Sequence, residues 1–201
     1  MKLYYFPVAP NPTKVRIYLA EKGLEVEQVR VNLVEGEQKS PEHLARNPFG
    51  KLPVLELGDG TYLTESLAII ELFEELHPDP PMLGATPLER ARVRMLERVA
   101  DLGVLIPVAR IIHATRSPLG LAPVPEIAAA ERSQLPRALE VLDARLAEST
   151  FLAGERPTLA DCTLAAAFGF ARFGQVEIDP GFANLARWSA EFEARPSVRN
   201  L

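Results

Sequence analysis

The 201-residue sequence is poor in the residue types that build disulfides and metal centres, with one cysteine and three histidines. A single cysteine cannot form an internal disulfide or a redox pair of neighbouring cysteines. The histidines, His43, His77 and His113, are far apart in the sequence and no cysteine stands near them, so we expect no metal site. Cys162 falls in a nearly all-apolar stretch, which indicates an unreactive, packed thiol.

Long apolar runs and an excess of basic residues are also missing. No run reaches the roughly 18 residues of a membrane span, and the opening MKLYYFPVAPNP lacks the apolar core of a signal peptide. A formal net charge of −5 argues against nucleic-acid binding, which needs clustered basic charge. With 47% hydrophobic and 24% charged residues, the composition is that of an ordinary globular protein. We therefore expect a cytoplasmic protein without a membrane or nucleic-acid partner.

The first 50 residues alternate between short strands and helices. An aromatic-rich strand is predicted over Lys2–Phe6. A helix should follow, with Asn11 as its N-cap and Pro12 at its first helical position. Apolar and polar residues alternate over residues 28–33, which indicates a second strand. Ser40 then precedes a short helix.

The stretch from residue 52 to residue 76 predicts a hairpin and a helix. Leu52–Leu57 is an apolar strand, a Gly-Asp-Gly reversal follows, and Thr61–Leu63 returns antiparallel. From Ser66 the apolar residues fall on a helical face, with the glutamates elsewhere. A proline is normally excluded from strand interiors, so Pro53 should sit at an edge or start, with a cis bond that turns the Leu52 amide outward. The element order βαβαββα matches a thioredoxin-like fold with a parallel first strand pair.

The second half is helical throughout. A proline-rich linker over residues 78–86 separates a domain at 1–77 from an all-α domain at 87–201. Capping boxes predict helix starts at Thr86 and Thr158. Pro107 should kink or end a segment of the long first helix, and Pro136 is an alternative start for the helix over residues 126–146.

Several of these segments together resemble the glutathione S-transferase family. They are the run Lys51 to Val54, the pair Glu65 and Ser66, the Phe151–Gly154 stretch before the box at Thr158, and the ending Arg195 to Val198. The resemblance implies that the Leu52 backbone before Pro53 pairs with the cysteine of glutathione, and that Glu65 and Ser66 hold its γ-glutamyl end. It also implies that Gln38 and Lys51 reach the glycyl end, and that the protein is a homodimer.

Family members keep the glutathione sulfur as a thiolate through a donor at or after the first strand. Many bacterial members have Ser or Cys where Ala9 stands, and Ala9 offers no donor. Two candidates remain for this catalytic role. Asn11 matches the asparagine of the nu class, whose amide can donate to sulfur. Tyr5 matches the tyrosine-type loop.

Three functions are compatible with these residues. The first is a glutathione transferase whose thiolate attacks a hydrophobic electrophile. The second is a glutathione-dependent disulfide reductase or peroxidase of the nu type, and the third is a non-catalytic scaffold that has kept the fold. Ala9 favours the scaffold, whereas the intact Leu52, Pro53, Glu65 and Ser66 favour the enzymes.

Overall fold

The computed structural model describes all 201 residues, and its N-terminal part has the predicted βαβαββα order. A four-stranded sheet carries three helices, and a 3₁₀ turn (Glu37–Lys39) precedes the second of them. The elements are β1 (Lys2–Tyr5), α1 (Pro10–Lys22), β2 (Glu27–Arg30), α2 (Pro41–Arg46), β3 (Val54–Glu56), β4 (Tyr62–Thr64) and α3 (Ser66–Leu76).

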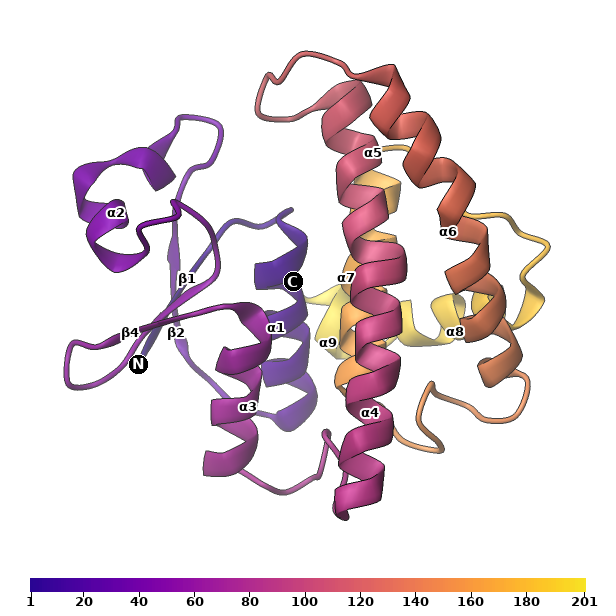
Figure 1. The fold of residues 1–201 in the computed structure, drawn as a ribbon. Coiled ribbons are helices and arrows are strands. Elements are labelled where there is room, and N and C mark those ends of the chain that lie inside the picture. The colour runs from indigo at the N-terminus through magenta and orange to yellow at the C-terminus, as the bar shows by residue number, and fades with distance from the viewer.

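The sheet has the strand order β2-β1-β3-β4. Strands β1 and β2 are parallel, and β3 runs antiparallel to both β1 and β4, as the sequence predicts. Helices α1 and α3 pack on the face of the sheet that looks toward the C-terminal part, whereas α2 lies on the other side (Figure 1). The starts of α1 and α3 therefore lie on the side of the sheet that faces the second half of the chain.

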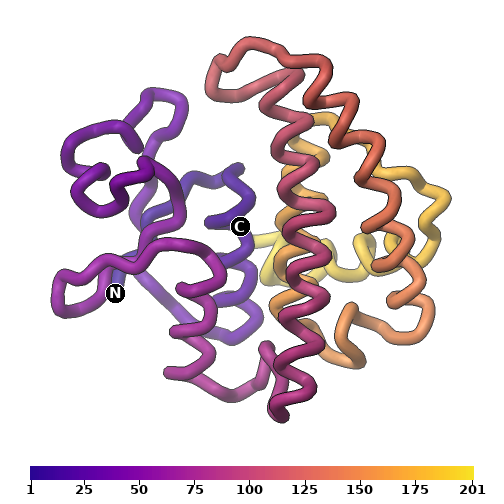
Figure 2. Tube along the Cα trace, viewed as in Figure 1, coloured from indigo at the N-terminus to yellow at the C-terminus, as the bar shows by residue number.

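The C-terminal part is entirely helical, in agreement with the prediction. Helices α4 and α5 form one rod that runs the height of the molecule (Figure 2). A π-helical turn (Asp101–Leu105) interrupts this rod, and Pro107 lies in the first turn of α5, so the expected break at this proline is confirmed. The helices are α4 (Pro87–Ala100), α5 (Ile106–Arg116), α6 (Pro125–Leu146), α7 (Leu159–Phe173), α8 (Ala183–Glu193) and α9 (Pro196–Arg199).

Both predicted capping boxes are present. The Thr86 hydroxyl accepts from the N–H of Glu89, whose carboxylate accepts from the N–H of Thr86. The Thr158 box with Asp161 begins α7, the most buried helix of the C-terminal part. Asp161 also accepts from the Trp188 indole at 3.0 Å, so this cap ties α7 to α8. The cis bond between Leu52 and Pro53 is confirmed as well.

Three expectations about element boundaries are wrong. Helix α1 begins at Pro10 with Ala9 as its N-cap, so Asn11 is the second helical residue. Pro10 suits a first helical position as well as Pro12 does, because both have the fixed φ of proline. The second strand was expected over residues 28–33 but covers Glu27–Arg30, the four residues that pair in parallel with β1. Pro136 lies inside α6, which already begins at Pro125.

Glu74 was expected on the polar side of α3 but is buried. Its carboxylate accepts hydrogen bonds from the Tyr18 hydroxyl and from the N–H of Leu83, and it pairs with the ammonium of Lys22 at 2.7 Å. These partners come from α1 and from the segment between α3 and α4. The contacts therefore hold that segment against α1.

One continuous apolar core joins the two halves of the chain. It includes Leu3 and Leu55 of the sheet, Leu83 of the connecting segment, and the residues of α7. None of the helices combines the length and the apolar character needed to cross a bilayer.

Candidate functional site

The sheet register brings two of the predicted ligand-binding segments together. Val54 of β3 is paired with Thr64 of β4. The residues beside this pair, Pro53 and Glu65, therefore lie at neighbouring ends of adjacent strands. Glu65 has φ 69°, an uncommon conformation for a residue other than glycine. It is the N-cap of α3, and its exposed side chain makes no capping hydrogen bond.

The backbone of Leu52 is free to bind a ligand. Leu52 lies outside the strands, and neither its N–H nor its C=O makes a hydrogen bond within the protein. The preceding carbonyl, that of Lys51, accepts from two side chains, the His43 ring at 3.2 Å and the Asn47 amide at 2.9 Å. Sequence reasoning assigned no role to His43 and saw Asn47 only as a turn former, because a contact to a main-chain carbonyl leaves no motif.

Gln38 and Lys51 lie at this same turn. The Gln38 carbonyl packs so closely on Gly50 that a Cβ there would lie 2.9 Å from its oxygen. The Oε1 atom of Gln38 is buried and has no hydrogen-bond partner. The Lys51 side chain is exposed. The exposed Lys51 ammonium is therefore available beside the free backbone of Leu52, and the Gln38 amide lies buried behind the turn.

The start of α1 offers very few hydrogen-bond donors. Pro10 and Pro12 have no N–H, and the N–H groups of Ala9 and Thr13 are bonded to backbone carbonyls. The Thr13 hydroxyl also donates to the Ala9 carbonyl. The N–H of Asn11 is therefore the one unpaired backbone donor in this first turn. An anion drawn to the positive end of the helix would meet Asn11 there.

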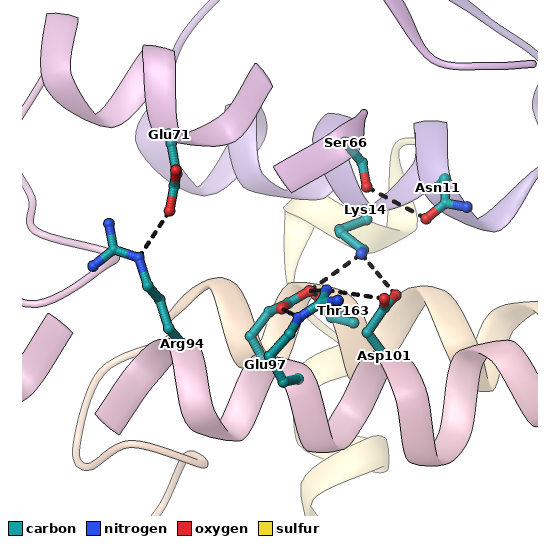
Figure 3. Close-up of polar contacts among 9 residues, drawn as sticks. Asn11, Lys14, Ser66, Glu71, Arg94, Glu97, Asp101 and Thr163 are labelled. Atoms are coloured by element: carbon teal, nitrogen blue, oxygen red, sulfur yellow. Dashed lines mark hydrogen bonds and ion pairs between the residues drawn. The ribbon is translucent and has the colours of Figure 1, made fainter. Parts of the chain in front are cut away.

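Asn11 and Ser66 are in contact, which joins the starts of α1 and α3. The Ser66 hydroxyl donates to Oδ1 of Asn11 at 3.3 Å. The amide nitrogen of Asn11 consequently points away from Ser66, as Figure 3 shows. This arrangement leaves the Asn11 Nδ2 group available as a donor beside its own backbone N–H.

Tyr5 faces a different part of α1. The Arg16 guanidinium lies over its ring, 4.5 Å from the centroid. Arg16 also donates to Gln28 of β2, the strand on the far side of β1 from β3 and β4. The Tyr5 hydroxyl makes no hydrogen bond to the protein. Of the two candidate donors, Asn11 is therefore the one that the structure brings to Ser66.

A buried group of charges lies next to Asn11 on α1. The Lys14 ammonium is 3.3 Å from the Glu97 carboxylate and 2.9 Å from that of Asp101 (Figure 3). Arg98 bonds to both carboxylates, and the Thr163 hydroxyl donates to Glu97. Lys14 and Glu97 are at most 1% exposed. The group joins α1 to α4, the π-helical turn and α7, and its two positive and two negative charges balance.

Two other titratable residues show how burial limits their chemistry. Burial raises the pKa of the Cys162 thiol well above its usual value, which agrees with the expected unreactive thiol. Burial lowers the pKa of His113, whose Nδ1 lies 3.0 Å from the Ser117 hydroxyl. Burial therefore favours the neutral form of the His113 imidazole.

A cavity of about 830 Å³ in the C-terminal part contains none of the predicted site residues. It lies between the end of α7 and α8 and is lined by apolar residues such as Phe168, Val176 and Phe182, with arginines such as Arg116 at its edge. The predicted site is instead an open arrangement of backbone and polar groups on the N-terminal part.

Two family models match this sequence. The model of the glutathione S-transferase N-terminal domain matches residues 1–73, and that of the glutathione S-transferase C-terminal domain matches residues 125–191. The first match covers the sheet with α1 to α3, and the second covers helices α6 to α8.

Relatives of known name cover the whole chain. Glutathione S-transferase 2 of Saccharomyces cerevisiae is 36% identical over 207 residues, which cover 100% of this chain and 89% of that protein. The crystal structure of Gtt2 from Saccharomyces cerevisiae has a TM-score of 0.92 at 36% identity and covers 100% of this chain and 99% of the other. A structure of glutathione S-transferase-I bound with lactoylglutathione has a TM-score of 0.82 at 30% identity, covering 99% of this chain and 96% of the other.

The ion pairs in Figure 3 predict a strong contrast in stability between two substitutions. Lys14→Met leaves the buried Glu97 without its ammonium partner, and we expect a loss of about 3 kcal/mol in the free energy of unfolding. Arg94→Met breaks the pair with Glu71, in which both side chains are about 40% exposed, and should cost under about 1 kcal/mol. Urea denaturation of both variants measures the difference.

Salt provides the control for this comparison. Raising the ionic strength should reduce the small effect of Arg94→Met and leave that of Lys14→Met nearly unchanged, because buried pairs are poorly screened. Equal losses for the two variants would contradict a structural role for the buried group.

Proposed function

Because this chain belongs to the glutathione S-transferase family, we propose that it is a transferase whose bound glutathione thiolate attacks a small hydrophobic electrophile. The contact between Asn11 and Ser66 carries this proposal. It joins the start of α1, where a thiolate would be stabilised, to the start of α3, where the γ-glutamyl end would bind. The full-length similarity to a protein named as a glutathione S-transferase disfavours the scaffold alternative.

Glutathione would bind along the segments around Pro53 and Ser66. Its cysteinyl residue would pair with the free N–H and C=O of Leu52. The γ-glutamyl carboxylate would lie at the start of α3 beside the Ser66 hydroxyl, and its ammonium would meet the Glu65 carboxylate. The glycyl carboxylate would meet Lys51 and Gln38. Each charged end of the ligand thus faces a group of opposite charge or a donor.

The Asn11 residue would stabilise the thiolate. A thiol with a reference pKa of about 8.5 is only a few per cent ionised at neutral pH. Lowering that pKa by two units needs about 2.7 kcal/mol of preferential stabilisation of the thiolate. A hydrogen bond to a charged group contributes about 1.5–3 kcal/mol. Together, the Asn11 amide, its backbone N–H and the positive end of α1 provide a stabilisation of the thiolate of the required size.

The electrophile would lie between this sulfur and the rod of α4 and α5. The solved relative bound with lactoylglutathione supports the general idea that a site of this fold holds glutathione joined to a second group. Ala9 offers no side-chain donor to the sulfur, so the thiol would lose its proton to water and the donors of Asn11 would hold the thiolate.

A glutathione-dependent disulfide reductase or peroxidase of the nu type is the second candidate. The observation that favours it is the position of Asn11, since this residue and not Tyr5 contacts Ser66. In such an enzyme the same thiolate attacks one sulfur of a disulfide and displaces the other as a thiolate. A second glutathione then attacks the mixed disulfide, which releases the second thiol and glutathione disulfide. No protein thiol is needed, which is compatible with the buried Cys162.

We further propose that the protein is a homodimer. Leu88, Met95 and Leu102 follow at intervals of seven residues along α4 and the π-helical turn, and they are 60%, 58% and 56% exposed. Within α4 this spacing keeps Leu88 and Met95 on one face of the helix, and Leu102 follows in the π-helical turn. An exposed apolar stripe of this kind is typical of a surface that is covered by a partner.

Titrating the bound thiol tests the proposed transferase most directly. Thiolate absorbance measured against pH should show saturable binding and a glutathione thiol pKa about two units below the free value. Asn11→Ala removes one donor but keeps the backbone N–H, so the pKa of the bound thiol should rise by about one to two units.

Tyr5→Phe is the matched control for Asn11→Ala, because it removes the other candidate donor. It should leave the pKa of the bound thiol unchanged. If Tyr5→Phe raises that pKa and Asn11→Ala does not, the donor assignment is wrong. A wild-type protein that does not bind glutathione would refute the function itself.

Product analysis separates the two candidate reactions. A transferase should conjugate an aromatic halide faster than it reduces a small disulfide such as 2-hydroxyethyl disulfide, at equal glutathione concentration. A faster reduction of the disulfide would establish the second candidate in its place.

The dimer proposal predicts a concentration-dependent sedimentation coefficient. Met95→Glu places a charge in the middle of the apolar stripe and should shift the protein to the monomer. Glu75→Gln, which also changes the net charge by one unit but at an exposed residue of α3, should have no effect. A wild-type monomer at high concentration would contradict the proposal.

A further inference from the structure

We propose that His43 and Asn47 are positioning residues for glutathione, which hold the Lys51 carbonyl inward and thereby point the Leu52 N–H at the ligand. The inference rests on the glutathione binding proposed above. It adds two residues that do not touch the ligand themselves.

Both donors are buried behind the turn. His43 is 1% exposed and Asn47 is 4% exposed. The His43 Nε2 and the Asn47 Nδ2 both reach the Lys51 carbonyl oxygen, at 3.2 and 2.9 Å. A carbonyl oxygen has two lone pairs, so these two donors satisfy it fully. The direction of this carbonyl is therefore set from the protein interior.

Peptide planarity carries this direction to the ligand side. The Lys51 C=O and the Leu52 N–H belong to one trans peptide unit, in which they point in opposite directions. A carbonyl held inward consequently turns the N–H of Leu52 outward, and this N–H has no partner in the protein. The cis bond belongs to the next peptide unit, Leu52–Pro53, and so does not by itself orient the Leu52 N–H as the sequence suggested.

The two donors are themselves held in place. The Asn47 Oδ1 accepts from the N–H of Phe49 at 3.1 Å, so its amide nitrogen must face Lys51. His43 must carry its proton on Nε2 to bond a carbonyl, and its buried Nδ1 has no partner. The ring therefore has one polar contact in the protein, the one to Lys51.

The test compares glutathione with a ligand that lacks the cysteinyl residue, γ-glutamyl methylamide. His43→Leu should weaken glutathione binding about tenfold, which corresponds to the loss of one hydrogen bond of about 1.4 kcal/mol. The fragment, which would use only Glu65 and Ser66, should bind as it does to the wild type. His43→Gln restores an amide donor and should recover most of the affinity.

His77→Leu is the matched control, because His77 is an exposed histidine outside the site, and it should leave both affinities unchanged. Asn47→Asp keeps the acceptor for Phe49 and replaces the donor with a carboxylate. It should also weaken the binding of glutathione but not that of the fragment. This second variant tests the inference even if His43→Leu does not fold.

Two results would overturn the inference. The first is that His43→Leu and Asn47→Asp bind glutathione as tightly as the control His77→Leu does. The second is that His43→Leu and Asn47→Asp fold but lose affinity for glutathione and for the fragment to the same extent. A wild type that binds no glutathione would instead refute the proposed function.

Discussion

The buried ammonium of Lys14 is the interaction on which the site depends most. It joins α1 to Glu97 and Asp101, and so connects the helix that carries Asn11 to the rod of the C-terminal part. Taking charges out of water costs several kcal/mol per ion, so such a group persists only with good geometry. Here each carboxylate also has Arg98 as a partner. The position of α1 against α4 is therefore closely defined.

One buried and one half-buried ion pair hold the other end of α1. Lys22 pairs with Glu74 of α3, and Glu21 pairs with Arg195 just before α9. Helix α1 is thus anchored to its own domain, to the connecting segment and to the C-terminal helices. We infer that this anchoring keeps the start of α1 in a constant position relative to Ser66. A donor that stabilises a thiolate has to be held in this way, because a preorganised donor needs no rearrangement during the reaction.

The local parts of the fold could be predicted from the sequence, because their signals lie within a few residues. The capping boxes at Thr86 and Thr158 and the hairpin around Asp59 are of this kind. The start of α1 was misplaced because Pro10 and Pro12 satisfy the same rule. The buried charges could not be predicted, since Lys14 and Glu97 are 83 residues apart and each resembles a surface residue in its own helix. The contacts of His43 to a backbone carbonyl likewise leave no pattern in the sequence.

We propose that the free donors at the start of α1 and the free backbone of Leu52 together receive one glutathione molecule. A crystal structure of the protein with glutathione tests it most directly. We predict that the sulfur lies within hydrogen-bonding distance of the Asn11 amide or backbone N–H, with the cysteinyl backbone paired to Leu52 and the γ-glutamyl carboxylate beside Ser66. A sulfur that lies against the Tyr5 hydroxyl, or a glutathione bound away from Leu52 and Ser66, would show that the site lies elsewhere or uses another donor.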